Sequence, residues 1–263
     1  MTIAGFDPGS GAGVTADIKT IAAHRCYGVA CITAITVQSS QGVRRVRTLE
    51  PSLIRQTLTE LADDLEIAAV KIGMLGEAEI VRAVAAFLKQ RNLRKIVLDP
   101  VLRSSSGARL LDQAGQKRLI EDLLPLATVV TPNLDEAAVL TGLRVTNRKD
   151  MPGAAARLHA LGAKAVVITG GHLSTATDFL SVRQQGRIEQ ETFSSRRLRS
   201  SCTHGTGCAF STALACHLAR GRSLRKAVRL AKSYLSGAVR SAYAVGKGVG
   251  PVNHLYRANW DVR

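Results

Sequence analysis

Aromatic side chains are scarce in this sequence, making up 4% of its 263 residues. Proteins that bind single-stranded nucleic acids stack bases on Phe, Tyr and Trp, so the scarcity argues against that role. No apolar run approaches the roughly 18 residues of a membrane-spanning helix. The first residues do not join a basic stretch to an apolar one. We therefore expect no secretion signal and no membrane partner, and a cytoplasmic protein.

The five cysteines are an odd number and include no CxxC pair. This pattern predicts reduced thiols rather than a disulfide framework. Cys26, Cys31 and Cys216 lie in apolar stretches, where we expect small core residues. The six histidines show no metal-ligand spacing, and we keep His172 and His204 as candidates because they adjoin predicted site loops.

Known phosphate-binding motifs are also missing. The sequence has no GxxxxGK[ST] loop, and its GxGxxG match fails because Val14 stands where the third glycine would be. The loop from Gly9 to Gly13 therefore has two interpretations. It is either a tight turn between a strand and a helix, or a glycine-lined surface that a flat ligand can approach closely.

Positive charge is the feature in excess. The chain has 36 Lys and Arg against 20 Asp and Glu, and residues 183–263 hold 15 of the former and 3 of the latter. A basic stripe of this kind is compatible with nucleic-acid binding, with a solvated helix face, or with steering of anionic substrates. No nucleic-acid motif accompanies it, so we do not expect nucleic acid as a partner.

Short apolar runs alternate with amphipathic helical patterns along the chain. The runs show little alternation of polar and apolar residues, which is typical of parallel strands buried on both faces. The predicted strands are a short one before Asp7, then 29–37, 68–72, 95–98, 128–130, 165–169, 179–182 and 187–193; the predicted helices are 14–23, 51–65, 78–90, 113–123, 134–140, 152–161, 206–219 and 224–244. This order predicts an α/β fold with a mostly parallel sheet, in one domain covering residues 1–263.

Polar, acidic or glycine residues follow every predicted strand. Ligands of open α/β sheets bind at the carboxyl ends of the strands, so these segments predict one shared site. They are 7–13, 38–40, 73–75, 99–101, 131–136, 170–172 and 203–208.

The segment Gly205-Thr206-Gly207-Cys208 opens a predicted helix. Unpaired N–H groups and the positive end of the helix dipole would form an anion hole there, suited to a phosphate in transfer. The same position predicts a lowered pKa for the Cys208 thiol. The plainer interpretation is a helix start with a buried cysteine.

Asp99, Asn133 and Glu136 form the one set of side chains that we expect at a divalent cation. Oxygen ligands suit Mg²⁺, which shares its coordination with water and nucleotide phosphates. Asn133 and Glu136 also have the spacing of a helix capping box, and both roles are compatible.

Taken together, the motifs resemble the hydroxymethylpyrimidine/phosphomethylpyrimidine kinase family of thiamine biosynthesis along essentially the whole chain. They are TIAGFDPGSGAGVTADIKT, CITAITVQSSQGV, KIGML, VLDPV, TPNLDEA, TGGHL, THGTGC and GKGVGPVNH. The resemblance implies a ribokinase-like three-layer α/β/α fold. It also implies ATP- and Mg²⁺-dependent phosphorylation of 4-amino-5-hydroxymethyl-2-methylpyrimidine, then of its monophosphate to the diphosphate. We expect a homodimer.

The resemblance also implies the roles of individual residues. Gln38 matches the glutamine that recognises the pyrimidine, and an amide offers that ring both a donor and an acceptor. The other implied substrate positions are Gly5, Ala12, Asp17, Met74 and Val101. The implied catalytic set is Gly205, Thr206, Gly207 and Cys208, the implied cofactor-binding set is Asn133, Thr169 and Gly171, and Asp99 and Glu136 are implied at the metal.

The sequence departs from the family where Thr169 replaces a usual lysine and Cys202 a usual asparagine. A missing cation slows phosphoryl transfer unless another replaces it, and Arg103 or an arginine of the basic last third are the candidates. Two alternatives therefore stay open beside the pyrimidine kinase. One is a vitamin B6 (pyridoxal) kinase on the same scaffold, and the other is a weakly active pyrimidine-binding protein.

Overall fold

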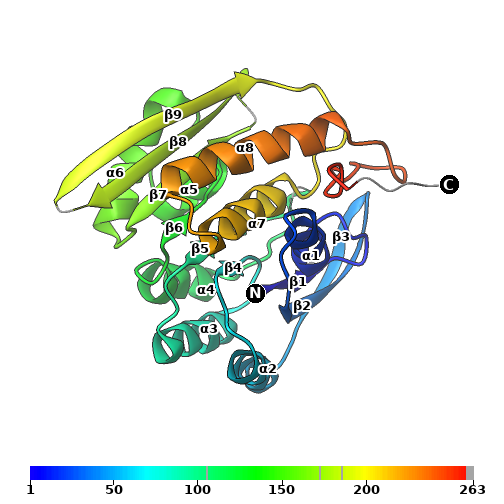
Figure 1. Cartoon of the computed structure of the whole chain (residues 1–263), viewed down its shortest axis with the longest axis vertical. Helices are drawn as coiled ribbons and strands as arrows, with labels where there is room; N and C mark the ends of the chain where they lie inside the picture. Colours follow the sequence, from blue (N-terminus) through cyan, green and yellow to red (C-terminus); the bar gives the residue numbers. More distant parts are fainter. Residues whose placement is uncertain (105, 172, 185, 259–263) are drawn as a thin grey trace.

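A computed structural model describes residues 1–104, 106–171, 173–184 and 186–258. Across these residues, one nine-stranded sheet runs through the molecule in the order β3-β2-β1-β4-β5-β6-β7-β8-β9 (Figure 1). Its strands are β1 (Thr2–Phe6), β2 (Ala30–Ser39), β3 (Gly42–Thr48), β4 (Val70–Ile72), β5 (Ile96–Leu98), β6 (Val129–Val130), β7 (Ala165–Gly170), β8 (Thr175–Gln184) and β9 (Arg187–Arg196). The six neighbouring strands β2, β1, β4, β5, β6 and β7 run parallel to one another. At one edge β3 pairs antiparallel with β2, and at the other edge β8 pairs antiparallel with β7 and β9 with β8.

Helices cover both faces of the sheet. They are α1 (Gly13–Ala23), α2 (Pro51–Asp64), α3 (Ala78–Arg91), α4 (Gln113–Arg118), α5 (Leu134–Thr141), α6 (Met151–Ala160), α7 (Thr206–Ala219) and α8 (Leu224–Arg240). Helices α7 and α8 pack on one face and α1 packs beside α7, whereas α2 to α6 line the other face. The prediction of an α/β fold with a mostly parallel sheet between two helical layers is therefore confirmed.

The central strands β4, β5 and β6 are buried on both faces. Neighbouring residues of β5 point to opposite cores: Ile96 and Leu98 pack with the α2–α6 layer, and Val97 packs with α7 and α8. Such strands carry no alternation of polar and apolar residues, which agrees with the sequence pattern.

Strand β3 is the element that the sequence pattern did not indicate. Its sequence GVRRVRT is rich in arginine because it lies at the edge of the sheet, with Arg44, Arg45 and Arg47 exposed. Charged side chains are common on edge strands, where they discourage pairing with another chain. Strands β8 and β9 are longer than predicted, and α8 ends at Arg240 rather than at 244. The helix predicted over 113–123 is regular to Arg118 and then widens into a π turn over Leu119–Leu123.

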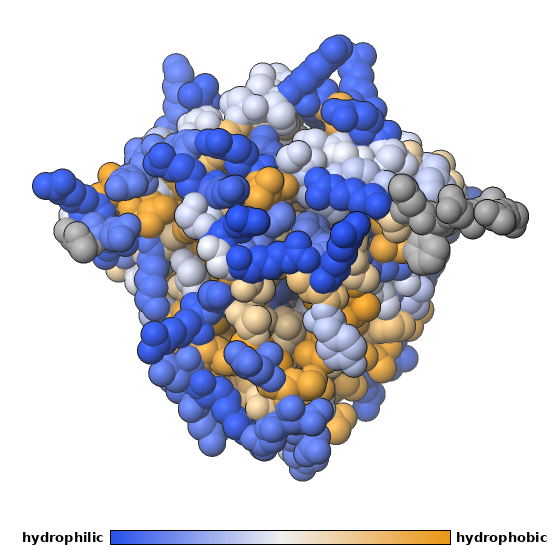
Figure 2. All heavy atoms as spheres, viewed as in Figure 1, coloured by the Kyte–Doolittle hydropathy of each residue, from blue (hydrophilic) through white to orange (hydrophobic). Residues whose placement is uncertain are grey.

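Figure 2 shows hydrophilic side chains over the region of α8 and β9. Part of this charge is paired, since Arg225 and Arg229 of α8 form ion pairs with Glu191 of β9. Cys31 and Cys216 are buried as predicted, while Cys26 is half-buried. Within the described part of the chain, no helix is long and apolar enough to cross a membrane.

Candidate functional site

Two glycine loops, nearly 200 residues apart in the sequence, touch at the carboxyl edge of the sheet. Gly205 has a left-handed backbone (φ +80°), and a Cβ there would lie 1.8 Å from the carbonyl oxygen of Gly11. A Cβ on Gly11 would in turn lie 2.3 Å from the ring of His204. Glycine is thus required at both positions by close approach, and the two loops form one wall of the site.

Asp7 organises the first of these loops. Its carboxylate accepts hydrogen bonds from the N–H groups of Gly9 (2.8 Å), Gly11 (3.2 Å) and Ala12 (2.9 Å), and it lies 2.9 Å from Nε2 of His204. Burial alone would raise the pKa of Asp7, but the hydrogen bonds from His204 and the loop amides hold it below its usual range. Sequence analysis did not single out Asp7. The feature that could have identified Asp7 from the sequence is its position, directly between a buried strand and a glycine loop.

Gln38 lies at the same point. It is the last residue but one of β2 and is half-buried, with its amide nitrogen 3.2 Å from Nε2 of His204 and its amide oxygen accepting from Thr36. The fold thus brings Gln38 and His204 together with Asp7, although His204 was a weak candidate in the sequence. His172, the other histidine candidate, lies outside the described residues.

A small apolar group lies at this end of β1 and β4. A Cβ on Gly5 would lie 2.8 Å from the sulfur of Met74, so these two predicted residues are in direct contact. Met74 is buried with Ala34 and Leu110, and Val101 packs against them half-buried. Ala12, also half-buried, is held by its N–H bond to Asp7. Four of the predicted substrate positions thus lie in the first glycine loop or in this apolar group.

Asp17, in contrast, has no surface to offer a substrate. It is fully buried, and its oxygens are occupied by Thr2 (2.5 Å), Lys71 (2.9 Å) and Thr212 (2.7 Å). The family match at Asp17 therefore corresponds to a supporting role beneath the site. Lys71, which sequence analysis missed, is the buried cation of this group at 1% exposure. Burial disfavours its charged form, but Asp17, Cys208 and Asp99 together raise the pKa of Lys71 and keep it protonated.

Helix α7 begins at the predicted anion hole. In the described structure, the N–H groups of Gly207 and Cys208 have no protein acceptor, as expected at a helix start. A Cβ on Gly207 would meet nothing closer than a carboxylate oxygen of Asp99, at 3.8 Å, so there is room beside these donors. The interpretation of Gly205–Cys208 as an anion-binding helix start fits this geometry.

The predicted lowering of the Cys208 pKa is wrong. Burial of the thiol raises the pKa of Cys208 to about 12, and the nearby negative charges of Asp17 and Asp99 act in the same direction. Lys71 and the N–H of Gly13 oppose this effect without overcoming it. The thiol is therefore protonated at neutral pH, because desolvation favours the neutral thiol over the thiolate that the sequence argument expected.

Asp99 and Glu136 lie close enough to influence each other. Asp99 is buried and accepts from Ser211 of α7 (2.9 Å), while Asn133 and Glu136 form the predicted capping box of α5. Burial and then the charge of Asp99 raise the pKa of Glu136 to about 8, and burial also raises that of Asp99. A cation would relieve both effects. Among the described residues, however, no three acidic, Cys or His side chains are arranged to hold a metal by themselves.

Thr169, the last residue but one of β7, lies next to Asn133 of the capping box. It bridges to Asn133 on one side and pairs across the strands with Asp178 of β8 on the other. Asp178 accepts a 2.8 Å ion pair from Lys232 of α8, whose side chain is 12% exposed. Arg103, one of the proposed substitutes for the missing lysine, is exposed and donates to the carbonyl of Gly107.

Gly171, which follows β7, is exposed, and a Cβ there would meet no atom within 4 Å. It is therefore open to a ligand, but it makes no contact that assigns it a role.

Comparison with known proteins places this site in a family. The family model described as phosphomethylpyrimidine kinase matches residues 7–253, from the carboxylate that begins the first loop to the segment after α8. The chain belongs to the phosphomethylpyrimidine kinase family. It is therefore a phosphotransferase, and a kinase of this family uses ATP.

Three relatives illustrate the similarity. The hydroxymethylpyrimidine/phosphomethylpyrimidine kinase of Streptomyces coelicolor is 42% identical over 97% of this chain and 93% of its own. The thiamine biosynthesis bifunctional protein ThiED of Geobacter sulfurreducens is 42% identical over all of this chain, which spans 53% of that longer protein. The ADP complex of Bacillus subtilis pyridoxal kinase superposes with a TM-score of 0.86 at 35% identity, covering 96% of this chain and 95% of that one. The expected ribokinase-like fold is confirmed.

Proposed function

We propose that this kinase phosphorylates hydroxymethylpyrimidine and then its monophosphate, as the names of its relatives indicate for those proteins. The observation that carries the proposal is the meeting of Gln38, His204 and Asp7 beside the amides that begin α7. A hydrogen-bonding amide for an aminopyrimidine edge and an anion hole for a phosphate thus share one wall. We further propose that residues 1–263 form one kinase domain and that the protein is cytoplasmic.

The chain contributes mainly positioning and charge stabilisation. Gln38 orients the ring, the apolar group around Met74 contacts its face, and the N–H groups of Gly207 and Cys208 stabilise the charge of the transferred phosphoryl group. Because the thiol of Cys208 is protonated, it is not a ready base. A water molecule, or the phosphate itself, accepts the proton of the attacking hydroxymethyl oxygen.

The residues present fit a magnesium ion that is shared with the nucleotide. Asp99 and Glu136 supply two oxygen ligands whose mutual repulsion a cation would relieve, and Mg²⁺ needs few protein ligands when phosphates and water complete its shell. Asn133 holds Glu136 in place through the capping box. When bound, the ion neutralises charge on the phosphates.

We also propose that Lys232 supplies the positive charge that the family's lysine would bring to position 169. Lys232 belongs to the basic last third of the chain. Its ammonium group binds Asp178, which is the cross-strand neighbour of Thr169 in β8. Thr169 leaves room and a hydroxyl group at the end of β7, and with Gly171 and Asn133 it would contact the nucleotide. The pyridoxal kinase alternative rests on the similarity of fold described above.

The proposed homodimer would use the open face of β2 at the sheet edge. Ile35 and Val37 are large apolar residues exposed by 48% and 57% there, next to β3. Light scattering on the purified protein tests this, with a mass near 56 kDa expected from the 28.0 kDa chain.

The proposed activity is tested by ADP release from purified protein at saturating Mg²⁺-ATP, with and without hydroxymethylpyrimidine. We expect release that depends on the pyrimidine. Tight pyrimidine binding with no ADP release would instead make this chain a binding protein, the alternative motivated by Thr169.

A further inference from the structure

A cavity of about 590 Å³ opens at the end of the sheet opposite the candidate site. Residues at the end of α3, at the beginnings of β5, β6 and β7 and at the end of β8 line it. Its lining includes four cationic residues (Lys89, Arg94, Lys164 and Arg183), and none of its 14 residues is acidic. The cavity is thus basic and separate from the residues of the kinase site.

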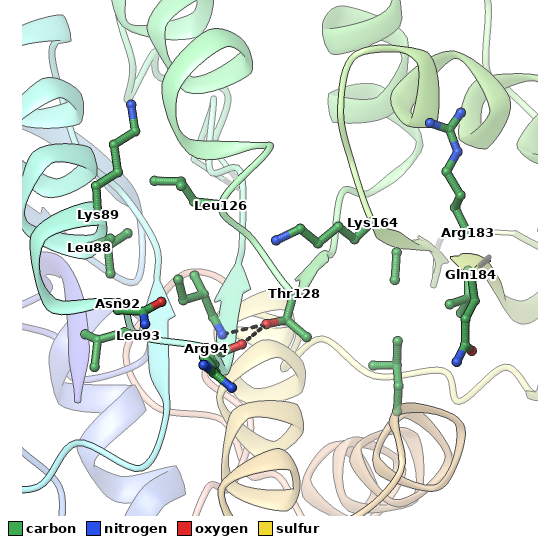
Figure 3. Close-up of a pocket in the computed structure, with 14 residues that line it drawn as sticks. Leu88, Lys89, Asn92, Leu93, Arg94, Leu126, Thr128, Lys164, Arg183 and Gln184 are labelled. Atoms are coloured by element: carbon green, nitrogen blue, oxygen red, sulfur yellow. Dashed lines mark hydrogen bonds between the residues drawn. The ribbon is translucent and has the colours of Figure 1, made fainter. Parts of the chain in front are cut away.

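The four cations have no counter-charge. Their side chains are exposed, and no ion pair within the described residues involves any of them. Lys164 and Arg183 are neighbours, because the N–H of Arg183 bonds the carbonyl of Lys164 at 2.9 Å. Figure 3 shows Lys164 extending across the opening, with Lys89 and Arg183 at opposite rims. Unpaired like charges around a concavity produce a positive potential that attracts anions.

Apolar side chains make up much of the cavity's lining. Leu88, Leu93, Leu126, Val182 and Leu224 line it, and Ile96 is buried at its base. Its volume lies within the range of small-molecule sites, which combine apolar walls with a few polar groups. Inorganic anions alone would leave this apolar surface uncovered.

The backbone around the cavity is firmly held. Thr128 accepts from the N–H of Ile96 (3.0 Å) and donates to the carbonyl of Arg94 (2.5 Å), which joins the loops that precede β5 and β6. The shape of the cavity is therefore part of the folded sheet rather than of a free loop.

We propose that this cavity binds a phosphorylated small molecule that carries a flat ring, with its phosphates on Arg94 and Lys164 and its ring on the leucine side chains that line the cavity. Arginine and lysine are the usual phosphate partners, and a ring of purine or pyrimidine size covers the apolar wall. Both nucleotides and the product of the proposed reaction have this chemistry. The proposal concerns binding and does not depend on which pyrimidine the kinase site accepts.

Calorimetric titration of the full-length protein with ADP tests the proposal. We expect two sites on the wild-type chain. The double variant Arg94→Glu/Lys164→Glu should keep one site and weaken the other at least about tenfold, with kcat and KM for ATP unchanged. A matched control, Arg55→Glu/Arg240→Glu, changes the net charge equally at exposed positions outside the cavity and should keep both sites.

Three other results would overturn the proposal or one of its parts. A single site on the wild-type chain, both with ADP and with the pyrimidine diphosphate, overturns the proposal while leaving the kinase activity, measured separately, intact. Equal loss in the control variant would show a general charge effect and no site. Inorganic pyrophosphate competing as strongly as ADP overturns the role of the ring, and the milder Arg94→Gln/Lys164→Gln pair repeats the test if the first variant does not fold. Titration with the pyrimidine diphosphate distinguishes a product site from a nucleotide site.

Discussion

At the scale of single residues, burial decides the chemistry of this site more than sequence position does. Cys208 stands at a helix start, where a thiolate is usually favoured, yet desolvation raises the pKa of this half-buried thiol to about 12. Asp7 is also largely buried, but four hydrogen-bond donors surround it and the pKa falls.

Cys208→Ser should reduce kcat by less than about tenfold, because a protonated thiol does not act as the base whose loss costs about 10²–10⁴-fold. The measurement is the steady-state rate of ADP release across pH 6–9. A loss of a hundredfold or more, together with a changed pH profile, would restore Cys208 as the proton acceptor.

Gln38→Ala should raise KM for the pyrimidine about tenfold or more and leave KM for ATP unchanged, because the amide contacts His204 and is not one of the N–H groups of α7 proposed to bind the phosphate. Gln38→Glu is the matched control, since it keeps the size of the side chain but not the amide donor. An effect confined to ATP would contradict the assignment of Gln38.

Sequence reasoning named most of these residues through family motifs and helix-start chemistry, but it could not see which side chains point inward. Asp17 matches a substrate position, and only the fold shows that three partners enclose it. Lys71 and Asp7 were missed for the same reason, since their contacts cross 54 and 197 positions of sequence.

At the scale of elements, helix α7 is tied to two buried carboxylates through consecutive hydroxyl groups. Ser211 donates to Asp99 and Thr212 to Asp17, so the anion hole at the start of α7 is held against β5 and α1. The sequence predicted α7 itself from its apolar pattern. These anchors were not predictable, because serine and threonine in a helix carry no sign of a distant partner.

Thr212→Val should lower the free energy of unfolding by about 1–3 kcal/mol, because it leaves one oxygen of the buried Asp17 without its donor. Thr57→Val is the control, since the Thr57 hydroxyl donates only to the carbonyl of Leu53 in its own helix α2, and the change should alter stability by less than about 0.5 kcal/mol. Urea denaturation measures both. Equal effects in the two variants would argue against a special anchor at Thr212.

Lys232→Met should raise KM for ATP about tenfold if Lys232 serves the phosphates, and it should also destabilise the fold by leaving Asp178 buried without its partner. The double variant Lys232→Met/Asp178→Asn removes that penalty. It should regain stability and keep the high KM. A double variant with wild-type KM would show that the pair is structural.

Buried helices and strands could be predicted from the sequence, whereas the exposed edge strand could not. The central strands and the helices were predictable because their apolar patterns are strong, and their ends agree within a few residues. Strand β3 was missed because an exposed edge strand made of arginine and valine has no core pattern to reveal it.

At the scale of the whole molecule, the basic last third has several uses. Some of its arginines pair with Glu189 and Glu191 of β9, one lysine binds Asp178 beside the kinase site, and Arg183 lines the cavity at the opposite end. The charge that first suggested nucleic acid is thus distributed over helix surfaces and the two places where we propose that phosphates bind.

The last segment of the chain closes on the first glycine loop through His254, which predicts a specific pH dependence. Its ring contacts the carbonyl of Gly11 (3.1 Å) and the hydroxyl of Thr20 (3.2 Å), and burial lowers the pKa of His254 to about 4 from 6.5. Between these values the unfolded chain binds a proton that the folded chain does not. The stability from His254 is therefore complete above pH 6.5 and is lost as pH falls toward 4, by at most about 3 kcal/mol.

Urea denaturation of the wild type and His254→Gln at pH 7.5, 6, 5 and 4 measures this effect. The two proteins should differ by a constant amount above pH 7, and the gap should narrow or reverse toward pH 4. Parallel curves over the whole range would show that His254 does not contribute.

The central claim is that this chain is a kinase for hydroxymethylpyrimidine and its monophosphate, on a scaffold that pyridoxal kinases share. The most direct measurement is kcat/KM for hydroxymethylpyrimidine, for its monophosphate and for pyridoxal, with one preparation of the enzyme at saturating Mg²⁺-ATP. We predict that both pyrimidines exceed pyridoxal by at least about tenfold. A higher kcat/KM for pyridoxal would contradict the account.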